Sequence, residues 1–297
     1  MTEQPTRSDA GTGSADGAAT IAVTGATGRL GGRVARRLAD AGVPQRLVLR
    51  DPARAPQLAG ATAVAGDYGD RAAVRAALDG VERVLMVSAP EAADRVDLHR
   101  AFVDAAAEAG VRHLVYISFF GASPNATFTL ARDHYATEQH IRASGLAHTF
   151  LRDNMYADLM PSMAGQDGVI RGPAGDGRVS VVALDDIADA AVAVLRSAPE
   201  HAGAVYSLTG PEALTLDEVT AILTEVTGRR AVYERETVEQ AYQSRAPYNA
   251  PDWMVDAWVS TYTAIAKGEL SDVTDDVERL TGHPATPLAD VVRAAGS

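Results

Sequence analysis

Short apolar runs alternate with longer amphipathic stretches through the first half of the chain. Apolar and β-branched residues favour strands at 20–24, 46–50, 62–65, 83–88, 112–118 and 148–152. Between them, stretches such as 28–41 and 97–109 have helical periodicity, and Gly42 and Pro44 end the first of these helices. Strand–helix alternation at this spacing predicts βαβ units that build a parallel sheet with helices on both faces.

The regular alternation stops near residue 153. Gly and Pro are frequent at 161–178, and predicted helices at 185–198 and 215–227 flank one more strand at 204–208. We therefore expect an α/β protein with a Rossmann-type doubly wound parallel sheet in residues 20–152. Residues 153–297 then form a mixed region with the returning strand and a smaller, mostly helical substrate-covering subdomain. The alternative is that these helices simply pack on the sheet.

Composition narrows the class of protein. The 297 residues are 46% hydrophobic and 22% charged, as in an ordinary soluble globular protein. The formal net charge of −12 argues against a nucleic-acid partner. No apolar run approaches the ~20 residues that span a membrane. Residues 1–19 are rich in Gly, Ser, Thr and Asp, which predicts a disordered tail rather than a secretory signal, so we expect a cytoplasmic protein.

The chain offers few residues for metal or thiol chemistry. It has no cysteine, which excludes disulfides, thiol nucleophiles and cysteine-based metal sites. Its seven histidines lack the spacing of metal ligands. We therefore expect no metal site.

The stretch "IAVTGATGRLGG" at 21–32 has the features of a dinucleotide-binding loop. Gly25 would form the tight turn, Gly28 would admit the pyrophosphate, and Gly31 would let the next helix pack against the strand. The loop follows a predicted strand and opens a predicted helix, whose N-terminus favours anions. Thr27, Arg29 and Leu30 complete the predicted contacts of this loop.

Charge at the end of the second strand indicates which dinucleotide binds. NAD sites usually carry an acidic residue there, whereas arginine accommodates a 2′-phosphate. Here the strand ends in Arg50, Arg54 follows, and Arg29 lies in the loop. Asp51 comes next but precedes Pro52, which suits a turn or cap. The pattern favours NADP(H) and leaves NAD(H) possible.

Two later strand ends complete the predicted cofactor site. Asp67 and Tyr68 follow the third strand, where they can bond and cover the adenine ring, or cap the helix at 69–78. Ser88, Ala89 and Pro90 follow the fourth strand, and their small size would let backbone pass near the nicotinamide ribose.

Several motifs together resemble one family. "IAVTGATGRLGG", "VLRDPARA", "GDYGD", "HYATEQHIRASGLAHTFLRDNMY" and the G-H-P-x-T-x-L ending at 282–288 are similar to NmrA-like atypical short-chain dehydrogenases. The similarity is greatest to the branch of type 2 NAD(P)H:quinone oxidoreductases and triphenylmethane reductases. It implies an NADP(H)-binding Rossmann domain, a C-terminal subdomain over the nicotinamide, and direct hydride transfer to quinones or dyes without flavin. Other members bind the cofactor as redox sensors.

The proton-donating pair of typical short-chain dehydrogenases, Tyr-x-x-x-Lys, is absent. The sole lysine is Lys267, and four residues after Tyr135 stands Gln139. A quinone or dye cation needs mainly a well-placed hydride, because conjugation stabilises the product, and positioning then carries most of the rate. The absence therefore favours a quinone-type acceptor over a simple carbonyl.

Candidate catalytic residues lie at the carboxyl ends of the fifth and sixth strands and on the following helix. They are His134, Ser118 and Tyr156. His134 could protonate the acceptor or position the nicotinamide ribose, or it could be a helix residue packed on the sheet.

Substrate-binding candidates lie at the same sheet edge, where open α/β sheets bind ligands. They are Phe119, Phe120, Asp153, Asn154 and Tyr156. The family more often has Asn where Asp153 stands, which suggests a shift in the charge of the preferred substrate.

The favoured hypothesis is an NADPH-dependent oxidoreductase that transfers hydride to a planar quinone-like or aromatic acceptor without flavin or metal. The alternative is a non-catalytic NADP(H)-binding redox sensor. We expect a monomer or homodimer that binds a small molecule.

Overall fold

The computed structural model describes residues 20–296, so the tail expected at 1–19 lies outside it. Seven strands form one sheet in the order β3-β2-β1-β4-β5-β6-β9, and every adjacent pair is parallel. Their bounds are β1 (Ile21–Thr24), β2 (Gln45–Leu49), β3 (Ala61–Ala65), β4 (Arg83–Met86), β5 (His113–Phe119), β6 (Ala147–Asp153) and β9 (Val205–Leu208). The predicted doubly wound sheet is confirmed.

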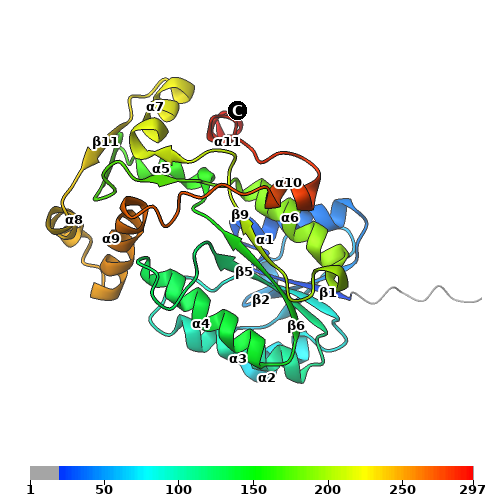
Figure 1. Cartoon of the computed structure of the whole chain (residues 1–297). Helices are drawn as coiled ribbons and strands as arrows, with labels where there is room; N and C mark the ends of the chain where they lie inside the picture. Colours follow the sequence, from blue (N-terminus) through cyan, green and yellow to red (C-terminus); the bar gives the residue numbers. More distant parts are fainter. Residues whose placement is uncertain (1–19, 297) are drawn as a thin grey trace, which may run out of the picture.

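Helices cover both faces of this sheet (Figure 1). One face carries α1 (Arg29–Asp40), α6 (Leu184–Arg196) and α10 (Asp276–Thr281), and the other carries α2 (Arg71–Ala77), α3 (Arg95–Glu108) and α4 (Thr129–Ala143). The two apolar layers are nearly free of solvent: Val34 and Ile187 lie in one, and Phe102 and Ile141 in the other. Burial on both faces explains why the central strands are continuously apolar.

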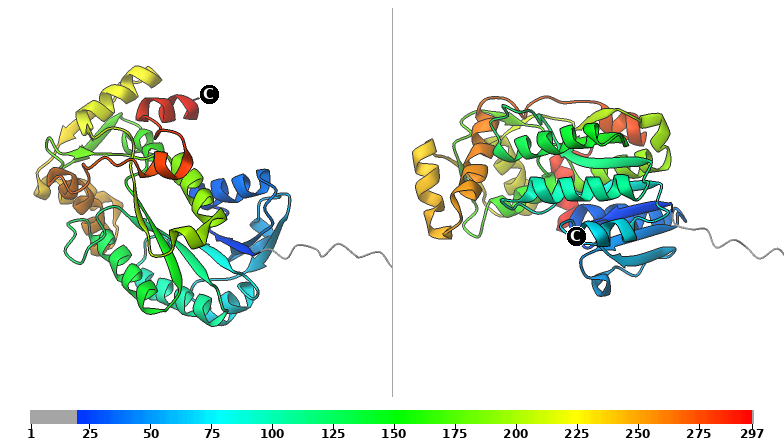
Figure 2. Two further views of the ribbon diagram at one scale, coloured as in Figure 1. Left: turned by 45° about the vertical axis from the view of Figure 1, so that its right-hand side comes forward. Right: turned by 90° about the horizontal axis from the view of Figure 1, so that it is seen from below.

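A second, smaller body lies beside the sheet (Figures 1 and 2). It has two small sheets, β8 (Arg178–Val179) with β10 (Leu214–Thr215) and β7 (Val169–Gly172) with β11 (Val232–Arg235). Its helices are α5 (Met160–Met163), α7 (Leu216–Thr227), α8 (Val238–Arg245), α9 (Asp252–Ala266) and α11 (Leu288–Ala295). Short 3₁₀ helices η1 (Pro52–Arg54), η2 (Ala157–Leu159), η3 (Ala198–His201) and η4 (Ala246–Tyr248) occur in connections.

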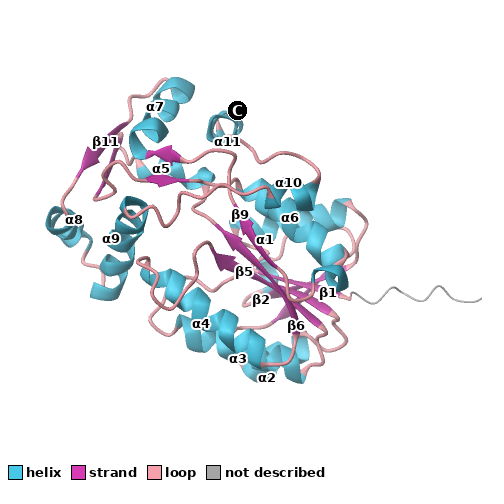
Figure 3. Cartoon of the chain, viewed as in Figure 1, coloured by secondary structure: helices cyan, strands magenta, loops and turns pink. Residues whose placement is uncertain are grey.

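Residues 153–296 are thus shared between the two bodies. β9, α6 and α10 return to the large sheet, whereas the other elements enclose a core of their own around Ile170, Val219 and Tyr262. In Figure 3 the arrowheads of β5, β6 and β9 point towards this second body. The carboxyl edge of the sheet is therefore the edge on which the second body can cover a ligand.

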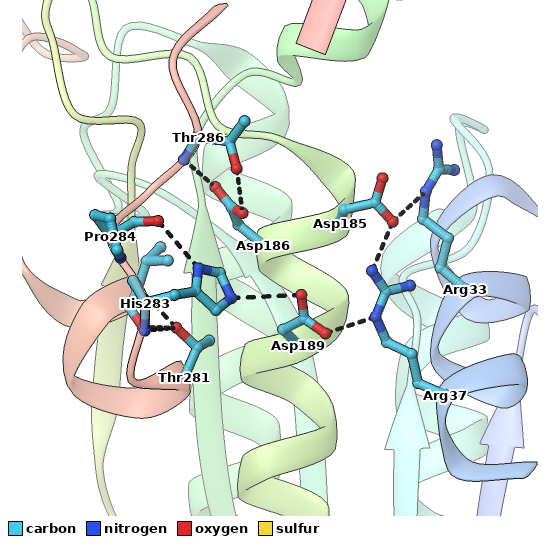
Figure 4. A network of polar contacts seen from close by, with 10 residues as sticks. Arg33, Arg37, Asp185, Asp186, Asp189, Thr281, His283, Pro284 and Thr286 are labelled. Carbon is cyan, nitrogen blue, oxygen red and sulfur yellow. Dashed lines mark hydrogen bonds and ion pairs between the residues drawn. The ribbon is translucent and has the colours of Figure 1, made fainter. Parts of the chain in front are cut away.

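A polar network fastens the C-terminal segment to the sheet (Figure 4). Arg37 of α1 bonds Asp185 and Asp189 of α6 at 2.7 and 2.6 Å, respectively. The buried Asp186 accepts hydrogen bonds from the backbone N–H (2.7 Å) and hydroxyl (2.8 Å) of Thr286. These bonds hold the chain across α6 before α11 rejoins the second body. No helix within residues 20–296 is long and apolar enough to cross a bilayer.

Candidate active site

The glycine loop has the geometry of a phosphate-binding turn. Gly25 has a φ of +66°, which side chains strongly disfavour. A Cβ on Gly31 would lie 2.4 Å from the carbonyl oxygen of Gly25, so only glycine lets α1 approach β1 this closely. Gly28 is the N-cap of α1 and provides no capping side chain. The first N–H groups of α1 therefore remain available for an anion.

A cavity of 360 Å³ opens over this loop. Every residue predicted to bind the cofactor lines it except Arg54, and Val48, Leu49, Gly66, Val87 and Leu98 complete the wall. Arg54 lies in η1 and is exposed. Arg29 and Arg50 are also exposed, and their guanidinium groups make no hydrogen bond or ion pair with other residues of 20–296. Two free cations therefore stand at the end of the cavity where a 2′-phosphate would lie.

Tyr68 closes the inner side of this cavity rather than offering its hydroxyl to a ligand. That hydroxyl lies 2.6 Å from the Thr24 hydroxyl and donates to the Val87 carbonyl at 2.6 Å, which joins the ends of β1 and β4. Asp67 accepts from the backbone N–H of Gly69, while Asp70 caps α2. The ring of Tyr68, packed 4.5 Å from that of Phe102, is the part that can face an adenine.

A second cavity, of 320 Å³, adjoins the first, and Ser88 lines both. Its walls come from the ends of β5 and β6, from α3, α4 and α9, and from the turn at 155–163. Phe119, Phe128, Met155, Tyr156 and Met163 make one side apolar. A third cavity beyond it shares Met155, Met163 and Thr261 and continues to Tyr248 and Trp258. This arrangement provides a slot that a large flat molecule can enter next to the cofactor cavity.

His134 is 6% exposed and lies in a chain of buried polar groups. Arg95 Nη2 lies 3.0 Å from His134 Nε2, and His134 Nδ1 lies 3.0 Å from the Tyr116 hydroxyl. Because a guanidinium can only donate, Nε2 accepts and the ring proton sits on Nδ1. Burial, helped by Arg95, holds the pKa of His134 well below its ordinary value. A neutral His134 with both nitrogens engaged is suited to positioning rather than to donating a proton.

Asp153 and Asn154 follow one another in the wall of the second cavity but differ in role. Asn154 donates both of its amide hydrogens, one to the Ser180 hydroxyl at 2.8 Å and one to the Leu270 carbonyl at 3.0 Å. It therefore fixes the turn. Asp153 Oδ2 accepts a hydrogen bond from the Tyr156 hydroxyl at 2.9 Å. Burial raises the pKa of Asp153 well above its ordinary range, and burial together with Asp153 raises that of Tyr156.

Besides Arg54, two residues predicted for catalysis or substrate binding lie outside both cavities. Ser118 is fully buried and donates to Glu138 at 2.6 Å, and Glu138 also accepts two hydrogen bonds from Arg152. The structure therefore gives Ser118 a structural contact instead of the predicted position facing a substrate. Phe120 belongs to the core of the second body, while its neighbour Phe119 lines the cavity.

The sequence analysis missed Arg95 and His99, which organise the segment after β4. Arg95 Nε donates to the Ala89 carbonyl at 3.0 Å, and the Ala89 N–H donates to His99 Nε2 at 2.8 Å. Burial, with Arg95 nearby, lowers the pKa of His99 to about 3, so its ring is a neutral acceptor. The sequence feature that could have identified Arg95 and His99 is their position on the helix after the fourth strand, at the ligand-binding edge of the sheet. Within residues 20–296 no cluster of three or more His, Asp or Glu side chains could hold a metal ion.

Comparison with known proteins agrees with this geometry. Residues 17–276 match the NmrA-like family. The chain is 36% identical to Quinone oxidoreductase 2 of Escherichia coli and 35% identical to the NAD(P)H azoreductase of Xenophilus azovorans, in each case over 92% of this chain and 97% of the relative.

Solved structures show the same fold. An NADPH complex of an NADPH-dependent quinone oxidoreductase from E. coli superposes with a TM-score of 0.85 at 34% identity, covering 93% of this chain and all of that one. The Citrobacter triphenylmethane reductase complexed with NADP(H) gives 0.82 at 32%, covering 93% and 99%. The chain belongs to the NmrA-like family, and it falls beside that family's quinone oxidoreductases and triphenylmethane reductases.

Proposed function

We propose that this protein is an NADPH-dependent reductase that passes a hydride directly to a quinone-like or other planar conjugated acceptor, without flavin. The observation that carries the proposal is the contact between two cavities at Ser88: one is built around a glycine loop, and the other has apolar and aromatic walls. The two relatives compared by sequence are oxidoreductases, and two of the solved structures with the same fold hold NADPH or NADP(H). This family membership supports oxidoreductase activity on NAD(P)H.

The residues present fit NADP(H). The uncapped start of α1 receives the pyrophosphate, and the close approach that requires Gly31 brings that helix to it. Arg50 and Arg29 hold the 2′-phosphate, since a guanidinium matches phosphate geometry. Ser88 lies where the two cavities meet, and the backbone at 88–90 would border the nicotinamide. Bound there, NADPH would supply the hydride.

The chain's own part in the reaction is to align the acceptor and exclude water. Phe119 and Tyr156 wall the second cavity with aromatic faces on which a flat ring can stack. Arg95 provides a fixed positive charge in the same wall. Such a charge stabilises the negative charge that develops on the acceptor oxygen after hydride transfer.

The test is turnover by the purified protein. We expect NADPH absorbance to fall when a quinone such as menadione is added, in protein whose spectrum shows no flavin. Tight NADPH binding without turnover of any quinone or dye would instead support the redox-sensor alternative. Equal rates with NADH and NADPH would overturn the assignment of Arg50.

A further inference from the structure

Asp153 is an unusual group in the wall of the second cavity. It ends β6, it is 2% exposed, and it shares the cavity with Arg95, His134 and Tyr156. Its Oδ2 accepts one hydrogen bond, from the neutral Tyr156 hydroxyl. Within residues 20–296 no cation forms an ion pair with Asp153, and no other residue hydrogen-bonds Oδ1.

Glu138 shows what a charged carboxylate in this protein requires. It is fully buried, and it receives hydrogen bonds from Ser118 Oγ and from Arg152 Nε and Nη2 at 2.6–2.8 Å. Asp153 is buried nearly as deeply with none of these charged donors. An ionised carboxylate without an ion pair is costly in such a place, so the group keeps its proton. Burial accordingly holds the pKa of Asp153 well above its usual range, although Tyr156 and Arg95 oppose the shift.

The hydrogen bonds also place that proton. With the Tyr156 hydroxyl as the donor to Oδ2, we assign the acidic hydrogen to Oδ1, the oxygen without a bond to another described residue. In the same wall, Arg95 Nη1 has no hydrogen-bond partner among the described residues, and its ion-pair partner Asp133 is 4.0 Å away. One wall therefore combines a proton-bearing carboxyl group with an incompletely neutralised cation.

We propose that Asp153 is a general acid, and that it extends the acceptors of this reductase to α,β-unsaturated carbonyl compounds. The inference rests on the proposed function for its hydride source. Such compounds differ from quinones in the anion that hydride transfer leaves. A hydroquinone anion is stabilised by its aromatic ring and can take a proton from water later, whereas an enolate is a strong base and benefits from an acid in place.

The step balances as a two-electron reduction. The β-carbon of the acceptor gains the hydride and forms a C–H bond, and NADPH becomes NADP⁺. The electron pair of the C=C bond moves towards the carbonyl oxygen, beside the Arg95 charge. The Oδ1–H bond of Asp153 breaks and its proton passes to that oxygen. Water returns a proton to the Asp153 carboxylate before the next turnover.

Few groups facing Asp153 change charge near neutral pH. From α4 it shares the cavity with His134, which is held neutral. Tyr156 has a raised pKa, and Arg95 and the exposed Glu91 come from the segment after β4. Reduction of an unsaturated ketone is therefore fastest while Asp153 is protonated. It falls as pH rises through the elevated pKa of that group.

The experiment compares cyclohexenone with menadione in the wild type, in Asp153→Asn and in Asp94→Asn. Asparagine keeps the shape and can still accept from Tyr156, but it has no proton to give. Asp94 is an exposed carboxylate next to Arg95 that lines neither cavity. We expect Asp153→Asn to lower kcat/KM for cyclohexenone by about 10²–10⁴ and to abolish its alkaline fall. The loss with cyclohexenone should greatly exceed any change in menadione reduction by the same variant, and the Asp94→Asn control should change neither rate.

A second readout needs neither cofactor nor turnover. Infrared spectra of the cofactor-free wild type at neutral pH should contain the carbonyl stretch of a protonated carboxyl group. This band should be absent in Asp153→Asn and retained in Asp94→Asn. Absence of that band in the wild type overturns the proposal, even if Asp153→Asn fails to fold. Reduction of menadione but not cyclohexenone overturns the general acid while the proposed function stands. Turnover of neither acceptor overturns both.

Discussion

The two cavities that meet at Ser88 are built on different principles. The first is shaped by backbone: a glycine turn, the uncapped start of α1 and small residues at 88–90, with the exposed cations Arg29 and Arg50 in its wall. The second is shaped by side chains from distant segments, with Arg95, His134 and Asp153 buried in its wall. We therefore expect affinity for the cofactor to depend on steric fit and surface charge. We expect the chemistry on the acceptor to depend on buried charge.

The most severe change to the first cavity is Gly31→Ala. Its Cβ would meet the Gly25 carbonyl oxygen at 2.4 Å and that of Thr24 at 2.6 Å, so α1 must move away from β1. We expect loss of measurable NADPH binding in calorimetry and a lower free energy of unfolding, by about 1–3 kcal/mol. Gly32→Ala on the same helix meets one backbone oxygen at 3.0 Å and should retain binding. Normal binding by Gly31→Ala would show that the close approach is dispensable.

The matching change in the second cavity is Arg95→Met. It removes the buried charge and leaves the Ala89 carbonyl and His134 Nε2 without their donors. We expect kcat for the acceptor to fall by about 10²–10³, as when a donor to a developing anion is lost, with NADPH affinity less affected. Steady-state kinetics measure the change in kcat, and calorimetry measures the change in NADPH affinity. The control is Arg100→Met on the exposed side of α3. A larger loss of NADPH affinity than of kcat would place Arg95 in the cofactor site instead.

Arg50→Ala tests the outer end of the first cavity, with Arg54→Ala as the matched control. Arg50 lines the cavity and Arg54 does not, although both are exposed. Loss of a charge-assisted bond to phosphate should weaken NADPH binding by about 1.5–3 kcal/mol and leave NADH binding unchanged. Titrations with both cofactors measure this. Equal weakening of NADH would mean that Arg50 does not contact a 2′-phosphate.

The different construction of the two cavities explains how much of each the sequence could predict. The large sheet and the first cavity depend on local patterns: the predicted strand 20–24 begins one residue before β1, the predicted strand 112–118 begins and ends one residue before β5, and twelve contiguous residues contain the glycine loop. The second cavity joins Arg95, Phe128 and Thr261, whose meeting depends on tertiary packing.

Side-chain direction and strand length explain the remaining differences. Ser118 shares a strand face with Tyr116, because side chains alternate, and that face meets α4. The strand pattern therefore predicts the end of β5 to within one residue, whereas the face on which Ser118 lies depends on which helix packs there. The small sheets of the second body were missed because strands of two to four residues, such as β8 and β7, give little periodic signal.

The smallest expected effect concerns His283, which lines neither cavity and belongs to the network of Figure 4. The Pro284 carbonyl, with Asp186 and Asp189 nearby, raises the pKa of His283 above its ordinary value. Protonated His283 therefore adds stability below about pH 6.5, and this is lost as pH rises through the raised pKa. Because His283 is 43% exposed, His283→Gln should cost at most about 0.5 kcal/mol in acid and nothing at high pH. Urea unfolding at several pH values tests this; a loss that grows with pH would contradict the assignment.

The central claim is that hydride passes directly from NADPH in the first cavity to an acceptor in the second. The most direct measurement is the rate of menadione reduction with NADPH that carries deuterium on one or the other face of nicotinamide C4. Since a cofactor bound in the first cavity would turn one face towards the second cavity, we predict that one labelled form slows turnover severalfold and the other does not. Equal rates with both, or turnover only after flavin is added, would contradict the account.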